Sequence, residues 1–104
     1  MAVKFSLNPN PTFKADVDIP VPGGDTATIN FTFKHKARDD FKAFLENLAD
    51  RDDVSIILDI ASGWGLEDKF NKENLESLTQ NYMGSGRAIL DRYIKEMAGV
   101  RQGN

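Results

Sequence analysis

The sequence predicts an α+β fold in which an N-terminal β-hairpin is followed by three to four α-helices. Two observations carry this prediction: apolar residues alternate with polar ones between residues 13 and 33, and after Lys36 the apolar spacing becomes that of a helix. The length of 104 residues fits one domain with a single core. We therefore expect one domain over residues 1–104, with a hairpin region at 1–36, a helical region at 37–98 and a flexible tail at 99–104.

The hairpin is predicted by two alternating runs joined by turn residues. In the first run the apolar side chains occupy the odd positions: Phe13, Ala15, Val17, Ile19 and Val21. The second run repeats the pattern at Ala27, Ile29, Phe31 and Phe33, and the intervening Pro22-Gly23-Gly24-Asp25 has the composition of a turn. Pro20 lacks a backbone donor, which favours an edge position for the first strand. A shorter alternation of Val3, Phe5 and Leu7 could add a third strand.

The helical region begins with an amphipathic segment whose predicted buried face contains Phe41, Phe44, Leu45, Leu48 and Ala49. Residues 52–61 are ambiguous, because Val54, Ile56, Leu58 and Ile60 alternate as in a strand, while Val54, Ile57, Leu58 and Ala61 form a helical stripe. We favour a helix, since Asp52 can cap its start and Gly63 can follow its end.

Two further helices are marked by their ends. Asn71 is a good N-cap, and Phe70 before it can pack on Leu75. The buried face of this helix is predicted to contain Leu75, Leu78 and Tyr82. The last helix follows Gly84-Ser85-Gly86, ends at Gly99, and has a buried stripe predicted at Ile89, Leu90, Tyr93, Ile94 and Met97.

The composition excludes several classes of protein. There is no cysteine, so disulfides, thiolate catalysis and cysteine metal sites are absent. The 13 basic and 16 acidic residues are interspersed, which argues against nucleic acid and anionic membranes as partners. The longest apolar run is far shorter than the about 20 residues of a membrane span, and no signal peptide is visible at the start. We expect a soluble cytoplasmic protein.

Few side chains could form a catalytic or metal site. The one histidine, His35, stands between two lysines, and Asp16 and Asp18 share the exposed face of a strand, where alternating acids are ordinary. The acidic run at 50–53 does not form a calcium loop, because Ser55 replaces the required glycine. The segment at 84–87 could hold a phosphate at a helix start, but we favour a turn with Ser85 as cap. We expect no enzyme activity, no cofactor and no metal, and interpret the chain as a small binding module.

Several short motifs, taken in order, resemble the tail assembly chaperones of long-tailed bacteriophages of the siphophage type. They are FSLNPNPTFKADVDIPVPGG at 5–24, TFKHK at 32–36, the Gly63-Trp64 pair, FNKENLESL at 70–78, the Asn81-Tyr82 pair, and the closing helix with Ala88 and Tyr93. The resemblance covers almost the whole chain. Each motif is weak alone, and their common order makes the match specific.

The resemblance implies a non-enzymatic protein that binds the tape measure protein in the host cytoplasm and helps it recruit tail tube subunits. Such chaperones are absent from the finished virion. In many such phages a frameshift-extended form contacts the tail tube protein. Separately from the resemblance, Pro20 and the acids on the first strand limit uncontrolled edge pairing, but its short exposed edge could join subunits, so self-association is a further expectation. The alternative is a generic protein-interaction or regulatory phage module without a chaperone role.

Four aromatic residues within the matching motifs are the candidates for partner binding: Trp64, Phe70, Tyr82 and Tyr93. Trp64 stands between two glycines, which predicts a sharp turn after the second helix. We expect its indole to fold back onto the core at this turn, while a contact with the client and a ligand pocket are the alternatives.

Overall fold

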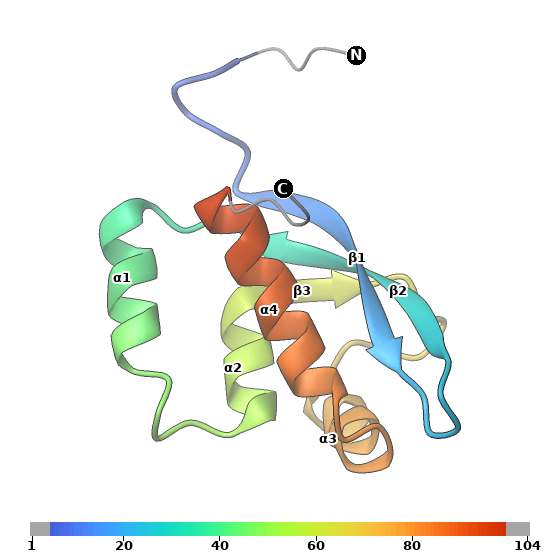
Figure 1. Ribbon diagram of the computed structural model, residues 1–104. Coiled ribbons are helices and arrows are strands. Elements are labelled where there is room, and N and C mark those ends of the chain that lie inside the picture. Colours follow the sequence, from blue (N-terminus) through green and yellow to red (C-terminus); the bar gives the residue numbers. More distant parts are fainter. Residues whose placement is uncertain (1–4, 100–104) are drawn as a thin grey trace.

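The computed structural model of the protein describes residues 5–99 and confirms an α+β fold with an N-terminal antiparallel hairpin, a short third strand and four helices (Figure 1). The elements in chain order are β1 (Thr12–Pro20), β2 (Thr26–Lys34), α1 (Arg38–Glu46), α2 (Asp53–Ile60), β3 (Ala61–Trp64), α3 (Lys72–Asn81) and α4 (Ser85–Ala98).

The hairpin forms as its alternation predicts. β1 and β2 pair antiparallel without a bulge, from Thr12 opposite Lys34 to Pro20 opposite Thr26. In the turn, Val21 N–H donates to Asp25 O at 2.8 Å. Gly23 and Gly24 have φ angles of 109° and 108°, a region that L-residues with side chains rarely adopt. These two glycines therefore allow the tight connection.

The third strand lies elsewhere than the sequence suggested. It is β3, which pairs antiparallel with the free side of β2, so that the sheet order is β1-β2-β3. The proposed N-terminal strand is wrong for its described part, because Phe5 and Leu7 pair with no strand and are 84% and 89% exposed. Val3 lies outside the described residues.

The choice of a helix for the ambiguous segment is confirmed over Asp53–Ile60, but its predicted end is wrong. Ala61 already has an extended backbone, with φ −133° and ψ 151°, and Gly63 lies in a strand opposite Thr32 instead of capping a helix. The reason is tertiary: β2 offers hydrogen-bonding groups on the side away from β1, and the chain leaving α2 pairs with them.

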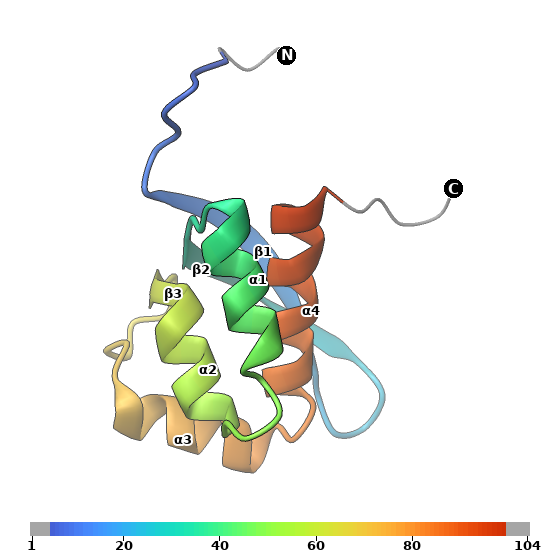
Figure 2. The same cartoon turned by 90° about the vertical axis from the view of Figure 1, so that its left-hand side faces the viewer.

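Two helices cover one face of the sheet. α4 packs on β1 and on α2, while α2 also contacts β2 and β3 (Figure 1). α3 lies across the ends of α2 and α4, and α1 stands beside these two helices on the side away from the sheet (Figure 2). The largest fully buried side chains come from all these layers except α1: Val17, Ile19, Phe31, Phe33, Ile57, Ile60, Leu75, Ile89 and Tyr93.

Helix ends follow the predicted signals in part. Asn71 caps α3, because its side chain accepts from Asn74 N–H at 2.8 Å, and Gly99 ends α4 in the left-handed conformation at φ 69°. Asp52 occupies the N-cap position of α2, but its side chain makes no capping hydrogen bond. Ser85 is not a cap, since the N-cap of α4 is Gly84 and Ser85 is the first helical residue, fully buried.

The predicted buried faces of the first and third helices include residues that are exposed in the structure. α1 ends at Glu46, so Ala49 falls outside it and is exposed, and Leu45 is 38% exposed. Tyr82 is 36% exposed because it follows α3 as the C-cap, with φ −127°, and so leaves the stripe that buries Leu75 and Leu78.

A polar network fastens α2 to the end of β2. The Asp59 carboxylate accepts from Arg51 Nη1 at 2.6 Å and from Lys36 Nζ at 3.1 Å, and Lys34 Nζ donates to Leu58 O at the end of α2. Burial by itself raises the pKa of Asp59, but the hydrogen bonds and charges of Arg51 and Lys36 outweigh it and hold the pKa below its ordinary value. These three cations also lie near the C-terminal end of α2, where the negative end of the helix dipole stabilises positive charge.

Candidate protein-binding surfaces

Trp64 is half-buried: its side chain packs against the core, and part of it stays accessible at the surface. Its ring meets Phe31 and Phe70 edge to face, with centroids 6.0 and 5.3 Å apart, and its Nε1–H donates to Asp68 O at 2.7 Å. Trp64 lies in β3, opposite Phe31, and not in a sharp turn. Neither flanking glycine has a positive φ, so the glycines are not required for a turn there.

The accessible side of Trp64 lies beside a small apolar area. Trp64, Leu66, Leu78 and Tyr82 line one open hollow of about 270 Å³, whose rim is polar. Leu66 is 40% and Tyr82 is 36% exposed. We call these four residues the Trp64–Tyr82 surface. Large apolar side chains with this exposure, surrounded by polar ones, are typical of protein-binding sites.

Three of the four aromatic candidates therefore lie together: Trp64 and Tyr82 share the hollow, and Phe70 packs against Trp64. The fourth, Tyr93, lies in the core and is fully buried. Its ring contacts those of Phe13, Phe33, Phe41 and Phe44, and its hydroxyl donates to Lys34 O at 2.7 Å. Burial, with a smaller contribution from the nearby Asp59 charge, raises the pKa of Tyr93 to about 12. Tyr93 is therefore a core residue that packs between the sheet and α1.

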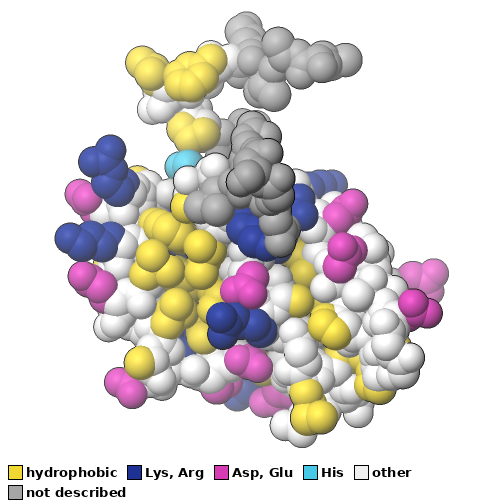
Figure 3. Space-filling model, viewed as in Figure 1, with side chains coloured by type: hydrophobic (Ala, Val, Ile, Leu, Met, Phe, Trp, Pro, Cys, Tyr) yellow, Lys and Arg dark blue, Asp and Glu magenta, His cyan; other side chains and the backbone are white. Residues whose placement is uncertain are grey.

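A second apolar surface was missed by the sequence reasoning. Figure 3 shows a broad hydrophobic area over α1 and α4. On α1 and the turn after it, half-buried Phe41 and Leu48 flank the exposed Leu45, and on α4 the half-buried residues Leu90, Ile94 and Met97 have the same spacing. We give the name α1–α4 surface to these six incompletely buried apolar residues on and just after the two helices. The sequence predicted all six as buried: Phe41, Leu48, Leu90 and Met97 do pack against the core, but none of the six is fully buried.

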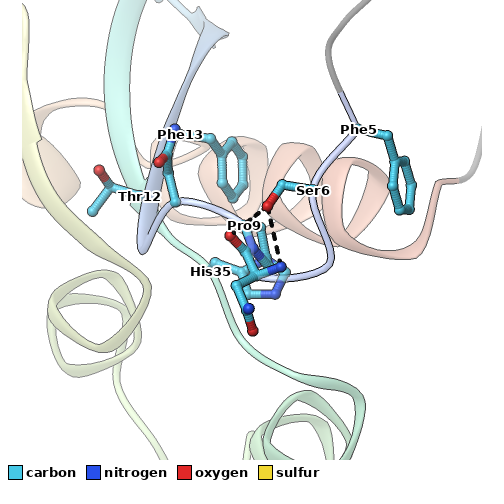
Figure 4. A pocket seen from close by; sticks show the side chains of 8 residues that line it. Phe5, Ser6, Pro9, Thr12, Phe13 and His35 are labelled. Atoms are coloured by element: carbon cyan, nitrogen blue, oxygen red, sulfur yellow. Dashed lines mark hydrogen bonds between the residues drawn. The ribbon is translucent and has the colours of Figure 1, made fainter.

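The N-terminal segment and His35 form a further hollow of about 430 Å³ at one end of the molecule. Figure 4 shows the rings of Phe13 and Phe5 on opposite sides of the view, with Ser6, Pro9 and His35 between and below them. His35 is exposed, and its backbone N–H donates to Pro11 O at 2.8 Å. Ser6 Oγ donates to Asn8 O at 3.1 Å, so the segment bends back on itself. Among the described residues that line this hollow there is no Asp, Glu, Lys or Arg, which gives a charged ligand little to recognise.

The acidic residues considered for metal binding have other partners. Asp16 and Asp18 accept hydrogen bonds from Asn30 and Thr28 on the neighbouring strand, at 2.9 and 2.8 Å. Within residues 5–99, no group of three or more histidine, cysteine or acidic side chains is arranged to hold a metal ion. In the same part of the chain, none of the helices has the length and apolar character needed to cross a membrane.

Comparison with known families agrees with these features. A family model described as phage tail assembly chaperone matches residues 1–104, the whole chain. The protein belongs to the phage tail assembly chaperone family. No curated protein and no solved structure gives a significant match. For a tail assembly chaperone, apolar surfaces that remain accessible are the features that bear on function, because such a protein acts by binding tail proteins.

Proposed function

We propose that this chaperone binds the tape measure protein in the host cytoplasm, helps it recruit tail tube subunits, and is not retained in the virion. The observation that carries the proposal is the family match over the whole chain. Contact with the tail tube protein through a frameshift-extended form is part of the same proposal. The role is one of binding, without catalysis.

The accessible apolar side chains fit this role physically. A tape measure protein is a long, largely helical chain, and its apolar stripes need cover until the tube surrounds them. An amphipathic helix binds by laying one apolar face on an apolar surface of its partner. Several small chaperones on one long client would gain further from multivalency.

We place the client on the Trp64–Tyr82 surface. Its residues are apolar, Leu66 and Tyr82 are exposed, and Trp64 is held in place by two ring contacts and a hydrogen bond. Aromatic residues of this kind dominate binding energy in many interfaces. Leu66 and Tyr82 are better probes than Trp64, since both are more than one third exposed and their truncation leaves the core intact.

Co-expression with the tape measure protein, followed by pull-down, tests the proposal. We expect the natural chain to bind and solubilise the client, and Leu66→Asp and Tyr82→Ala to reduce the recovered complex at least about tenfold, as for interface residues worth over 1.4 kcal/mol. The matched control is Leu45→Asp, which places the same charge at a leucine of similar exposure on the α1–α4 surface.

The outcomes distinguish between the two candidate surfaces and between the two candidate functions. If Leu45→Asp abolishes the complex and Leu66→Asp does not, the client lies on the α1–α4 surface. If the natural chain binds no part of the tape measure protein, the generic protein-interaction module replaces the chaperone role. Thermal unfolding of each variant shows whether a lost complex reflects a lost fold.

A further inference from the structure

The outer edge of β1 carries a row of backbone groups without a strand partner. In the described part of the chain β1 pairs only with β2, so its other side is open over nine residues (Figure 1). Val21 N–H donates to Asp25 O, and His35 N–H to Pro11 O, both in the register of the ladder. Because bonded pairs alternate along an antiparallel ladder, the odd residues of β1 bond to β2, and Thr12, Lys14, Asp16 and Asp18 direct their backbone N–H and C=O to the open edge.

The side chains along this edge are complementary to those of a second copy in one register. We propose that two copies pair through β1, antiparallel, about a two-fold axis at Ala15. This register places Lys14 opposite Asp16 of the second copy and Thr12 opposite Asp18 of the second copy, and the two-fold axis makes each of these pairs occur twice. All four of these pairs join residues whose backbone groups face the open edge, so each pair can form two hydrogen bonds.

Neighbouring registers lack this match. An axis at Asp16 sets that carboxylate against its own copy and places Thr12 opposite Pro20, which has no N–H to donate. An axis at Lys14 sets two ammonium groups opposite each other, and like charges directly across a ladder destabilise it. At the proposed axis the two opposing residues are alanines, small enough for the close approach of a non-hydrogen-bonded pair. The result is a six-stranded sheet continuous across the two copies.

Charge exchange on the full chain tests the pairing. Sedimentation equilibrium is expected to show a monomer–dimer equilibrium, which Lys14→Asp or Asp16→Lys weakens at least about tenfold, because each variant creates two like-charge pairs. The double variant Lys14→Asp/Asp16→Lys restores opposite charges and is expected to return association to within about threefold of the natural chain. The matched control is Asp18→Lys, which faces Thr12 and should change the dissociation constant less than about threefold.

The design separates pairing from folding. Asp16→Lys also removes the hydrogen bond from Asn30, but the double variant lacks the same bond, so restored association reports the charge match alone. Hydrogen exchange gives a second readout: the amides of Lys14 and Asp16 should become protected as the concentration rises. The proposal is overturned if the natural chain stays monomeric at the highest soluble concentration, which would follow if α4 blocks a second strand from this edge. It is also overturned if the natural chain dimerises but the double variant does not associate.

Discussion

Removal of the Tyr93 hydroxyl and removal of its whole side chain should have separable effects on stability. Tyr93→Phe keeps the ring among four aromatic neighbours and removes only the donor to Lys34 O. A buried hydrogen bond of this kind contributes about 1 kcal/mol, which lowers Tm by about 4–8 °C in a domain of this size. Tyr93→Ala also leaves a cavity and should cost about 3–5 kcal/mol, a large part of the stability of a small domain.

The pH dependence gives Tyr93 a second signature. Its folded pKa of about 12 lies above the ordinary value of 10.0, so the folded protein holds this proton more tightly than the unfolded chain. The stability from Tyr93 is therefore fully present below pH 10 and is lost as the pH rises through 12, by about 2–3 kcal/mol. Tyr93→Phe, which has no proton to lose, should not show this alkaline loss.

Urea unfolding at a series of pH values between 7 and 11 measures the effect of the hydroxyl and about the first half of the alkaline loss, which reaches about 1.4 kcal/mol at pH 11. The buried position of Tyr93 predicts that the free energies of unfolding of the natural chain and Tyr93→Phe converge as the pH rises. If Tyr93→Ala costs less than about 1 kcal/mol, or if the two curves stay parallel above pH 10, then Tyr93 is not the buried, hydrogen-bonded residue that the structure describes.

Three other predictions concern single contacts. Trp64→Ala should cost about 3 kcal/mol, less than a fully buried tryptophan, and the natural emission should move to the red on unfolding; an unchanged Tm would place Trp64 outside the core. Asp59→Asn should cost about 1 kcal/mol at pH 7. Because the pKa of Asp59 is lowered, this difference should shrink as the pH falls through the folded pKa, and a constant difference down to pH 2 would contradict the ion pairs. Gly86→Ala should lower Tm despite the better helix propensity of alanine, because its Cβ would lie 2.5 Å from Asp53 Cγ and 3.0 Å from Asp53 Cβ; a raised Tm would refute this contact.

Elements with strong local signals were predictable from the sequence. The hairpin could be predicted because alternation and turn residues are local, and the ends of α3 and α4 because Asn71 and Gly99 act within their own turns. β3 could not be predicted, since Ala-Ser-Gly-Trp has no alternation and forms a strand only because β2 is free to pair with it. The segment before β1 shows the reverse: Phe5 and Leu7 alternate but have no strand beside them.

The candidate surface was predictable only in part, for a similar reason. Trp64, Phe70 and Tyr82 were chosen as aromatic residues within motifs, and the fold brings them together by pairing β3 with β2 ahead of α3. Tyr93 looked equivalent in sequence but lies where β1, β2 and α1 converge. Exposure depends on how the helices pack, and the period of a helix cannot distinguish an apolar stripe facing the core from one at a binding surface.

The central claim is that this phage tail assembly chaperone binds the tape measure protein through the Trp64–Tyr82 surface. The most direct measurement is the amount of tape measure protein that co-purifies with the natural chain, with Leu66→Asp and with Leu45→Asp, after co-expression of each with the same client. We predict a stable complex for the natural chain and Leu45→Asp, and loss of the complex for a folded Leu66→Asp. Equal recovery with all three proteins, or no recovery with the natural chain, would contradict the claim.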